Sequence, residues 1–324
     1  DLPVHDMLHA KVDGKVLLPG NRIQFHADSP IVDKVTGAVQ FSEHGFVLQD
    51  LQGQALGGAV RFSGGMDVSG LPAGADHGPR VDVRAQGVAT ADGLLRAKEL
   101  GSVVQLAQLA QGQTAYQLRI SMAQGVPLVE VRSDLNGMAL ALPPPLNKAA
   151  DAVWPTHFAS TVPEGAPTPL VRQNMQLDVG GRLQLRYVRD ISPDDATPDK
   201  VVSGALRLGA GALTLPAKGV IAEVQLPQLD VQQWQALAQR IKTMAAPARA
   251  GATDAAASPA AAGDPYAAFL PDHWDIRLDT VQVRGMEIQK LHLRGSRTGA
   301  RWRSQVSSSL LDGQLEYEQE AKGP

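Results

Sequence analysis

Strict alternation of apolar and polar residues constrains the fold of this chain more than any other sequence feature. Asn174–Val179 alternates at every position, and after Gly180–Gly181 the pattern resumes over Leu183–Tyr187. Alternation of this kind predicts two half-buried strands joined by a glycine turn. The same pattern recurs over Tyr116–Met122, Val129–Val131, Ala205–Leu208, Glu223–Leu226, Asp275–Leu278, Val281–Val283 and Leu291–Leu293.

Strands with one apolar and one polar face are typical of antiparallel sheets that are solvated on one side. A unit of strand, glycine turn and strand recurs loosely at Gly37–Phe62 and again at Val281–Gly295. A meander built from such units makes an elongated sheet. We therefore predict a mainly β fold: an elongated, twisted, largely antiparallel sheet that curls around an apolar groove.

Two segments break the alternation with helical spacing. Ala91–Gln111 carries apolar residues suited to an amphipathic helix that breaks at Gly101. Asp230 and Gln233 form a capping box, after which apolar residues follow at helical intervals until Pro247. We expect two short amphipathic helices, either of which could cover part of the apolar face.

Composition shifts divide the chain into four parts. Ala245–Ala262 is dominated by Ala with Pro, Gly, Ser and Thr, which predicts a flexible linker. We expect a β-rich repeat region over 1–150 with a helical insertion near 91–111, a β-hairpin region over 151–244 ending in the capped helix, the linker over 245–263, and a β-rich repeat region over 264–324.

The composition excludes several chemistries. The chain has no cysteine, so disulfides, thiol nucleophiles and cysteine-based metal sites are ruled out. A net charge of -3 with only 4% aromatic residues argues against nucleic-acid binding. Common nucleophile, Walker and zinc motifs are missing, and few aromatic side chains remain for a carbohydrate site. We expect no enzyme activity, catalytic residue, metal or cofactor, with a carbohydrate-active domain as the less favoured alternative.

The apolar face has two interpretations. It is either the inner face of an ordinary sandwich or barrel, or a groove wall that lipid chains cover. Periodicity alone does not distinguish these two interpretations. Each CH₂ group that is buried contributes about 0.8 kcal/mol, which suffices to hold a long acyl chain. The predicted wall comprises Leu118, Ile120, Met122, Met175, Leu177, Val179, Leu183, Leu185, Leu206, Leu208, Val224, Leu226, Ile276 and Leu278.

One proline-rich motif carries a family resemblance. Ser133–Ala150, which reads SDLNGMALALPPPLNKAA, resembles a motif of AsmA-like bacterial proteins and is closest to the YhdP group. We interpret it as a structural turn: a strand with Met138, Leu140 and Leu142 on one face, stopped by prolines that cannot donate to a ladder. The matching positions are Ser133, Asp134, Leu135, Gly137, Leu142, Pro143, Pro145, Leu146 and Lys148.

The resemblance implies an internal part of a long envelope protein of a Gram-negative bacterium, located in the periplasm and anchored in the inner membrane through the full-length protein. Members of this group resemble bridge-like lipid-transfer proteins and are implicated in moving phospholipid between inner and outer membranes. The implied partners are phospholipid acyl chains and the two membranes, with protein partners unknown. The alternative is an envelope scaffold that carries no lipid.

Overall fold

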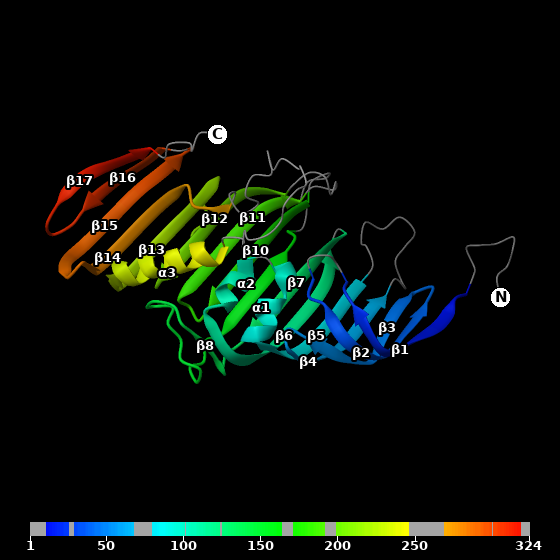
Figure 1. Cartoon of the computed structure of the whole chain (residues 1–324). Helices are drawn as coiled ribbons and strands as arrows, with labels where there is room; N and C mark the ends of the chain where they lie inside the picture. Colours follow the sequence, from blue (N-terminus) through cyan, green and yellow to red (C-terminus); the bar gives the residue numbers. More distant parts are fainter. Residues whose placement is uncertain are drawn as a thin grey trace, which may run out of the picture. The chain divides into compact units, whose positions relative to one another are not determined.

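The computed structural model describes residues 11–25, 29–67, 80–100, 102–123, 125–163, 171–191, 199–245, 269–299 and 301–318. The chain forms two compact units, one comprising residues 1–141 and 148–166 and the other residues 142–147 and 167–324. Figure 1 colours the elements in chain order. The four-part organisation expected from composition stays a prediction, and its linker lies outside the described residues apart from Ala245.

The first unit is a sheet of sequential antiparallel neighbours from β1 to β7, after which β7 pairs with β9 and the short β8 pairs with the start of β6. Its elements are β1 (Asp13–Ile23), β2 (Val32–Ser42), β3 (Gly45–Ala55), β4 (Gly58–Asp67), β5 (Arg80–Thr90), α1 (Ala91–Arg96), the 3₁₀ turn η2 (Lys98–Leu100), α2 (Ser102–Ala107), β6 (Ala110–Ala123), β7 (Val126–Ser133), β8 (Met138–Leu140) and β9 (Thr156–Thr161).

The second unit is a mixed sheet whose strands lie in chain order (Figure 1). Its elements are β10 (Val171–Val179), β11 (Leu183–Ile191), β12 (Lys200–Gly209), β13 (Gly219–Asp230), α3 (Val231–Ala245), β14 (His273–Val283), β15 (Met286–Thr298), β16 (Arg301–Ser307) and β17 (Asp312–Glu318). A mainly β, largely antiparallel fold is thus confirmed. The exceptions are the two pairs that β13 makes, with β12 and with β14, which are both parallel.

The helical segments differ in detail from the sequence-based expectation. The first segment begins where Thr90 caps α1, its hydroxyl accepting a hydrogen bond from the Gly93 amide at 2.9 Å. It ends at Ala107, earlier than predicted, because Ala110–Gly112 joins β6 and pairs with β8. The second, α3, starts directly after Asp230, whose carboxylate accepts hydrogen bonds from the Gln232 and Gln233 amides. Among the helices that the structure describes, none combines the length and apolar character needed to cross a bilayer.

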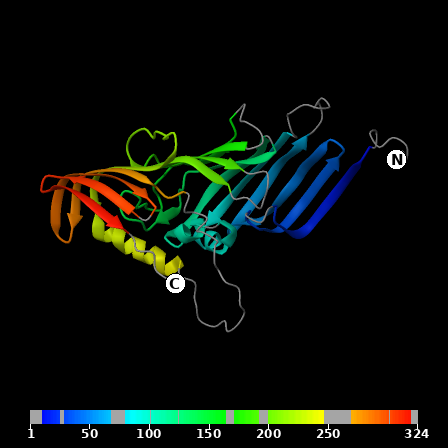
Figure 2. The same ribbon diagram turned by 90° about the horizontal axis from the view of Figure 1, so that it is seen from above.

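Each unit has its own apolar core. In the first unit it centres on residues of β2 to β5, with Val35 and Val60 each 1% exposed. In the second, Leu208, Leu226, Leu278 and Val281 are buried beneath Val231 and Trp234 of α3. Figure 2 shows α3 lying along one face of the strands of this unit.

A glycine in β15 is required by close packing. Gly295 lies between Trp274 on β14 and the backbone of β16, where a Cβ would meet both the Trp274 indole and the Arg303 carbonyl oxygen. The Trp274 and Trp302 rings lie 5.2 Å apart between centroids. A side chain at position 295 would therefore push Trp274 out of its place.

We predict that Gly295→Ala lowers the free energy of unfolding by about 1–3 kcal/mol, the usual cost of overpacking. Gly313→Ala is the matched control, because a Cβ at Gly313 in β17 meets nothing within 4 Å. Denaturant melts of both variants test this prediction. Equal stability of the two variants would contradict it.

Candidate functional site

Cross-strand register in the second unit gathers the predicted wall residues on one face. Leu183 faces Leu208, which faces Val224, which faces Ile276. At one end Val179 faces Leu183, and at the other end Ile276 faces Leu293, which faces Val306. We call the resulting set the central apolar row: Val179, Leu183, Leu208, Val224, Ile276, Leu293 and Val306.

Two further lines of apolar residues flank the central apolar row. On one side Leu177, Leu185 and Leu206 face one another, and Ala222 and Trp274 continue the line. On the other side, Leu226 faces Leu278, which faces Leu291. Met175 lies next to the first line, opposite Tyr187. All eleven wall residues predicted in this unit therefore share one face of the sheet.

The other three predicted residues lie in the first unit, on one face of β6. Leu118 faces Ala85 on one side and Val131 on the other, and Ile120 faces Val83 and Val129. Met122 faces Pro127 at the end of the β6–β7 hairpin. The row through Leu118 comprises Leu51, Phe62, Ala85, Leu118, Val131 and Phe158.

The apolar face of the second unit is only partly covered. Leu226 is 3% exposed and Val281 1% exposed where α3 packs on them. Near the other flank, Tyr187 stacks edge-on with Phe269 at a centroid distance of 5.2 Å. Between these covers, most members of the central apolar row are partly exposed. The part between α3 and Phe269 is thus an apolar surface that still contacts solvent.

The opposite face carries charge. On this face a polar row crosses all eight strands of the second unit. Along most of the strands its residues alternate with those of the central apolar row and of the line through Leu177. The polar row comprises Asp178, Gln184, Arg207, Glu223, Asp275, Arg294, Gln305 and Gln314.

Ion pairs hold this polar face together. The Arg207 guanidinium lies 2.6 Å from the Glu223 carboxylate. Burial opposes ionisation of Asp275, but a hydrogen bond from His292 and the charges of Arg277 and Arg294 outweigh it, so the pKa of Asp275 is lowered. A face of paired charges stays hydrated and gives no site for an acyl chain.

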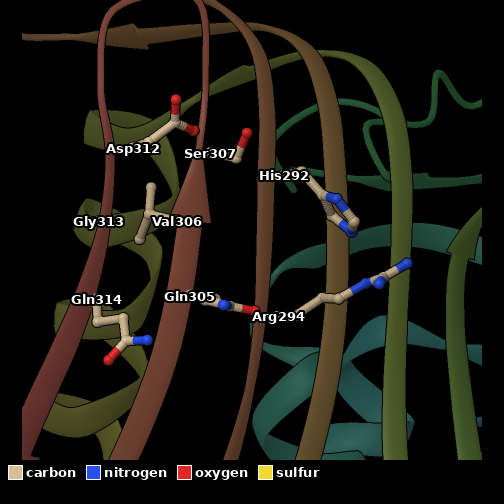
Figure 3. A pocket seen from close by; sticks show the side chains of 8 residues that line it. All are labelled: His292, Arg294, Gln305, Val306, Ser307, Asp312, Gly313 and Gln314. Atoms are coloured by element: carbon tan, nitrogen blue, oxygen red, sulfur yellow. The ribbon is translucent and has the colours of Figure 1, made fainter.

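The described hollows of the surface are lined mainly by polar residues. Figure 3 shows one of them, lined by His292 and Arg294 of β15, residues 305–307 of β16 and residues 312–314 of β17. Another, in the first unit, is lined by Arg84, Arg119 and Arg132 with their neighbours. Val306 is the one member of the central apolar row that lines a described hollow, and the predicted wall residue Leu118 lines the hollow in the first unit. Neither hollow is an apolar groove, so the groove stays a prediction.

The proline-rich motif forms a hydrogen-bonded turn around a buried lysine. Lys148 is 2% exposed, and its Nζ donates to the carbonyl oxygens of Leu135, Met138 and Ala149 at 2.6, 2.8 and 3.1 Å. Burial lowers the pKa of Lys148, although nearby Asp134 opposes the shift. The charge is thus compensated by backbone carbonyl oxygens.

Other motif residues shape the same turn. The Ser133 hydroxyl donates to the Ala115 carbonyl at 2.7 Å, and the Asp134 carboxylate accepts from the Asn136 amide at 2.9 Å. The strand is shorter than predicted: β8 ends at Leu140, which pairs with Lys148 instead of continuing to Leu142. Of the rest, Leu142, Pro143 and Pro145 are partly buried, and Leu146 packs against the core of the second unit.

Sequence reasoning missed several members of these rows. Leu293 lies within a recognised alternating run, yet only the β14–β15 register shows that it continues the central apolar row. Val306 comes from a Ser-rich strand whose apolar content is low. The burial of Lys148 has no sequence signal, because its three acceptors are backbone carbonyls.

We predict that Lys148→Met destabilises the first unit by about 2–4 kcal/mol, because it leaves buried carbonyl oxygens without a donor. Hydrogen exchange of the amides over 133–150 and thermal unfolding test this. Lys218→Met, at an exposed position, is the control and should change neither measurement. Unchanged exchange in Lys148→Met would refute the structural role of this lysine.

Comparison with known protein families assigns the chain to one of them. The model of the family described as YhdP protein matches residues 1–324, the whole sequence. Neither the comparison with curated proteins nor that with solved structures gives a match. Since the family model covers the full length, the chain belongs to the YhdP family.

Proposed function

We propose that the apolar face of the second unit binds phospholipid acyl chains, and that the chain is a periplasmic segment of a protein that transports phospholipid between membranes. The central apolar row is the observation that carries this proposal. The bridge-like lipid-transfer proteins that the YhdP group resembles support it as well.

The length of the central apolar row suits an acyl chain. Neighbouring strands lie about 4.8 Å apart, so seven strands span about 29 Å. The hydrocarbon core of a bilayer, which two acyl chains fill end to end, is about 30 Å thick. The row is therefore long enough for two extended acyl chains end to end, each in contact with apolar side chains along its whole length.

Hydrophobic burial supplies the driving force. Each methylene removed from water contributes about 0.8 kcal/mol, and partly exposed side chains of the row gain further burial from the same contact. Aliphatic Leu, Val and Ile side chains make a surface without hydrogen-bonding groups. Such a surface favours any long hydrocarbon chain over a polar ligand.

The proposal involves no chemical step. It assigns the chain no enzyme activity, catalytic residue or cofactor, and its partners are acyl chains and, through the whole protein, the inner and outer membranes. The inner-membrane anchor and the periplasmic location belong to the same proposal.

A photo-crosslinking amino acid tests which face contacts lipid. Placed in cells at Leu177 or Leu185, which face each other on β10 and β11, it should capture phospholipid. Gln176 and Gln184 are the matched controls, because they precede these residues in the same strands and point to the polar face. Labelling at the controls should be at least tenfold weaker. Equal labelling of both faces would overturn the proposal.

A charge on the apolar face should prevent lipid binding. We predict that Leu185→Asp lowers the lipid retained by the purified protein about tenfold or more, since losing contact with two methylenes already costs about 1.6 kcal/mol. Gln184→Asp, on the polar face, should retain lipid normally. Native mass spectrometry without detergent measures the bound lipid, and circular dichroism confirms that both variants fold.

These measurements also separate the proposal from its alternatives. A folded wild-type protein that carries no lipid and labels on neither face would be an envelope scaffold. If Leu185→Asp unfolds, Leu206→Asp on the facing strand repeats the test. Loss of folding in both variants would assign these positions to an ordinary core.

A further inference from the structure

Helix α3 occupies part of the surface that the proposed function assigns to lipid. Val231 and Trp234 pack on the cluster that contains Leu226, Leu278 and Val281. Leu226 and Leu278 face each other in the line next to the central apolar row. The helix and an acyl chain would thus compete for one continuous apolar face.

The packing of α3 is imperfect. The indole Nε1 of Trp234 is buried without a hydrogen-bond partner among the described residues. A buried donor left unpaired opposes the docked position, because the same N–H would bind water if the helix moved away. The helix surface is otherwise rich in glutamine and alanine, with Gln233, Gln235 and Ala236 exposed.

The described attachment of α3 to β13 is local to the first turn of the helix. Its first residue follows β13 without a loop, and the Asp230 carboxylate caps it through the Gln232 and Gln233 amides at 2.9 and 3.3 Å. The Gln233 side chain also donates to Asp230 at 3.1 Å. These contacts are local to the helix start, so they survive a swing of the helix about Asp230.

We propose that α3 is a displaceable cover of the apolar face, which closes over Leu226, Leu278 and Val281 in the lipid-free protein and yields this surface to an acyl chain. This inference rests on the proposed function and adds its regulation. A cover of this kind keeps the buried end of the face out of water when no lipid is present. An amphipathic helix suits the role, because its polar side stays solvated in both positions.

The lack of cysteines makes a direct test possible. Leu237 is 8% exposed on α3, and Val35 is 1% exposed in the core of the first unit. Single-cysteine variants Leu237→Cys and Val35→Cys of the full chain report opening at α3 and in the other unit respectively. The rate of maleimide labelling is measured with and without dihexanoylphosphatidylcholine below its critical micelle concentration.

We expect the lipid to accelerate labelling of Leu237→Cys at least tenfold and to leave Val35→Cys unchanged. Lipid binding is followed in parallel with the crosslinker at Leu185. Crosslinking with unchanged Leu237→Cys labelling would overturn the cover while leaving the proposed function intact. No crosslinking at Leu185 would overturn both. Equal acceleration at the two cysteines would show general unfolding and would also refute a cover.

A second variant tests the weak point of the docked helix. Trp234→Phe replaces the indole with a smaller phenyl ring and so removes the unpaired N–H, which should slow labelling of Leu237→Cys in the absence of lipid by about threefold or more. Trp302→Phe is the control, because Trp302 stacks on Trp274, away from α3. Faster labelling in Trp234→Phe would contradict the argument from the unpaired indole.

Discussion

The hydrogen-bond register between neighbouring strands is the constraint on which the rest of this structure depends. Side chains alternate between the two faces of a strand, so a shift of one residue would move every Leu of β11 to the charged face. Register holds Leu183 opposite Leu208 and, in the adjacent line, Gln184 opposite Arg207. The separation of apolar and charged rows across many strands follows from repeating this alignment.

Features set by the local sequence pattern could be predicted from the sequence, whereas features set by long-range pairing could not. Period-two alternation predicted the β10–β11 hairpin and the face on which Leu177 and Leu185 lie, because both depend on neighbours in the chain. The capping box at Asp230 likewise marked the start of α3. Such features are encoded within a few residues, so a single sequence suffices to find them.

Features that join distant segments were less accessible. Nothing in the pattern of Gly219–Asp230 distinguishes parallel from antiparallel pairing, because half-buried strands alternate in both. The end of α2 depends on β8, about thirty residues later in the chain, which pairs with the start of β6. Lys148 looks like any surface lysine until its three carbonyl acceptors are assembled around it.

The parallel pairing of β13 also has a consequence for how the second unit assembles. On either side of it, β10–β12 and β14–β17 are meanders whose contacts are close in sequence, and such contacts form quickly. By contrast, β13 joins β14 only after the chain from Val231 to Asp272 has closed into a loop, at a higher entropic cost. The cooperativity of folding in this unit therefore depends on a single strand, which links two otherwise self-contained meanders.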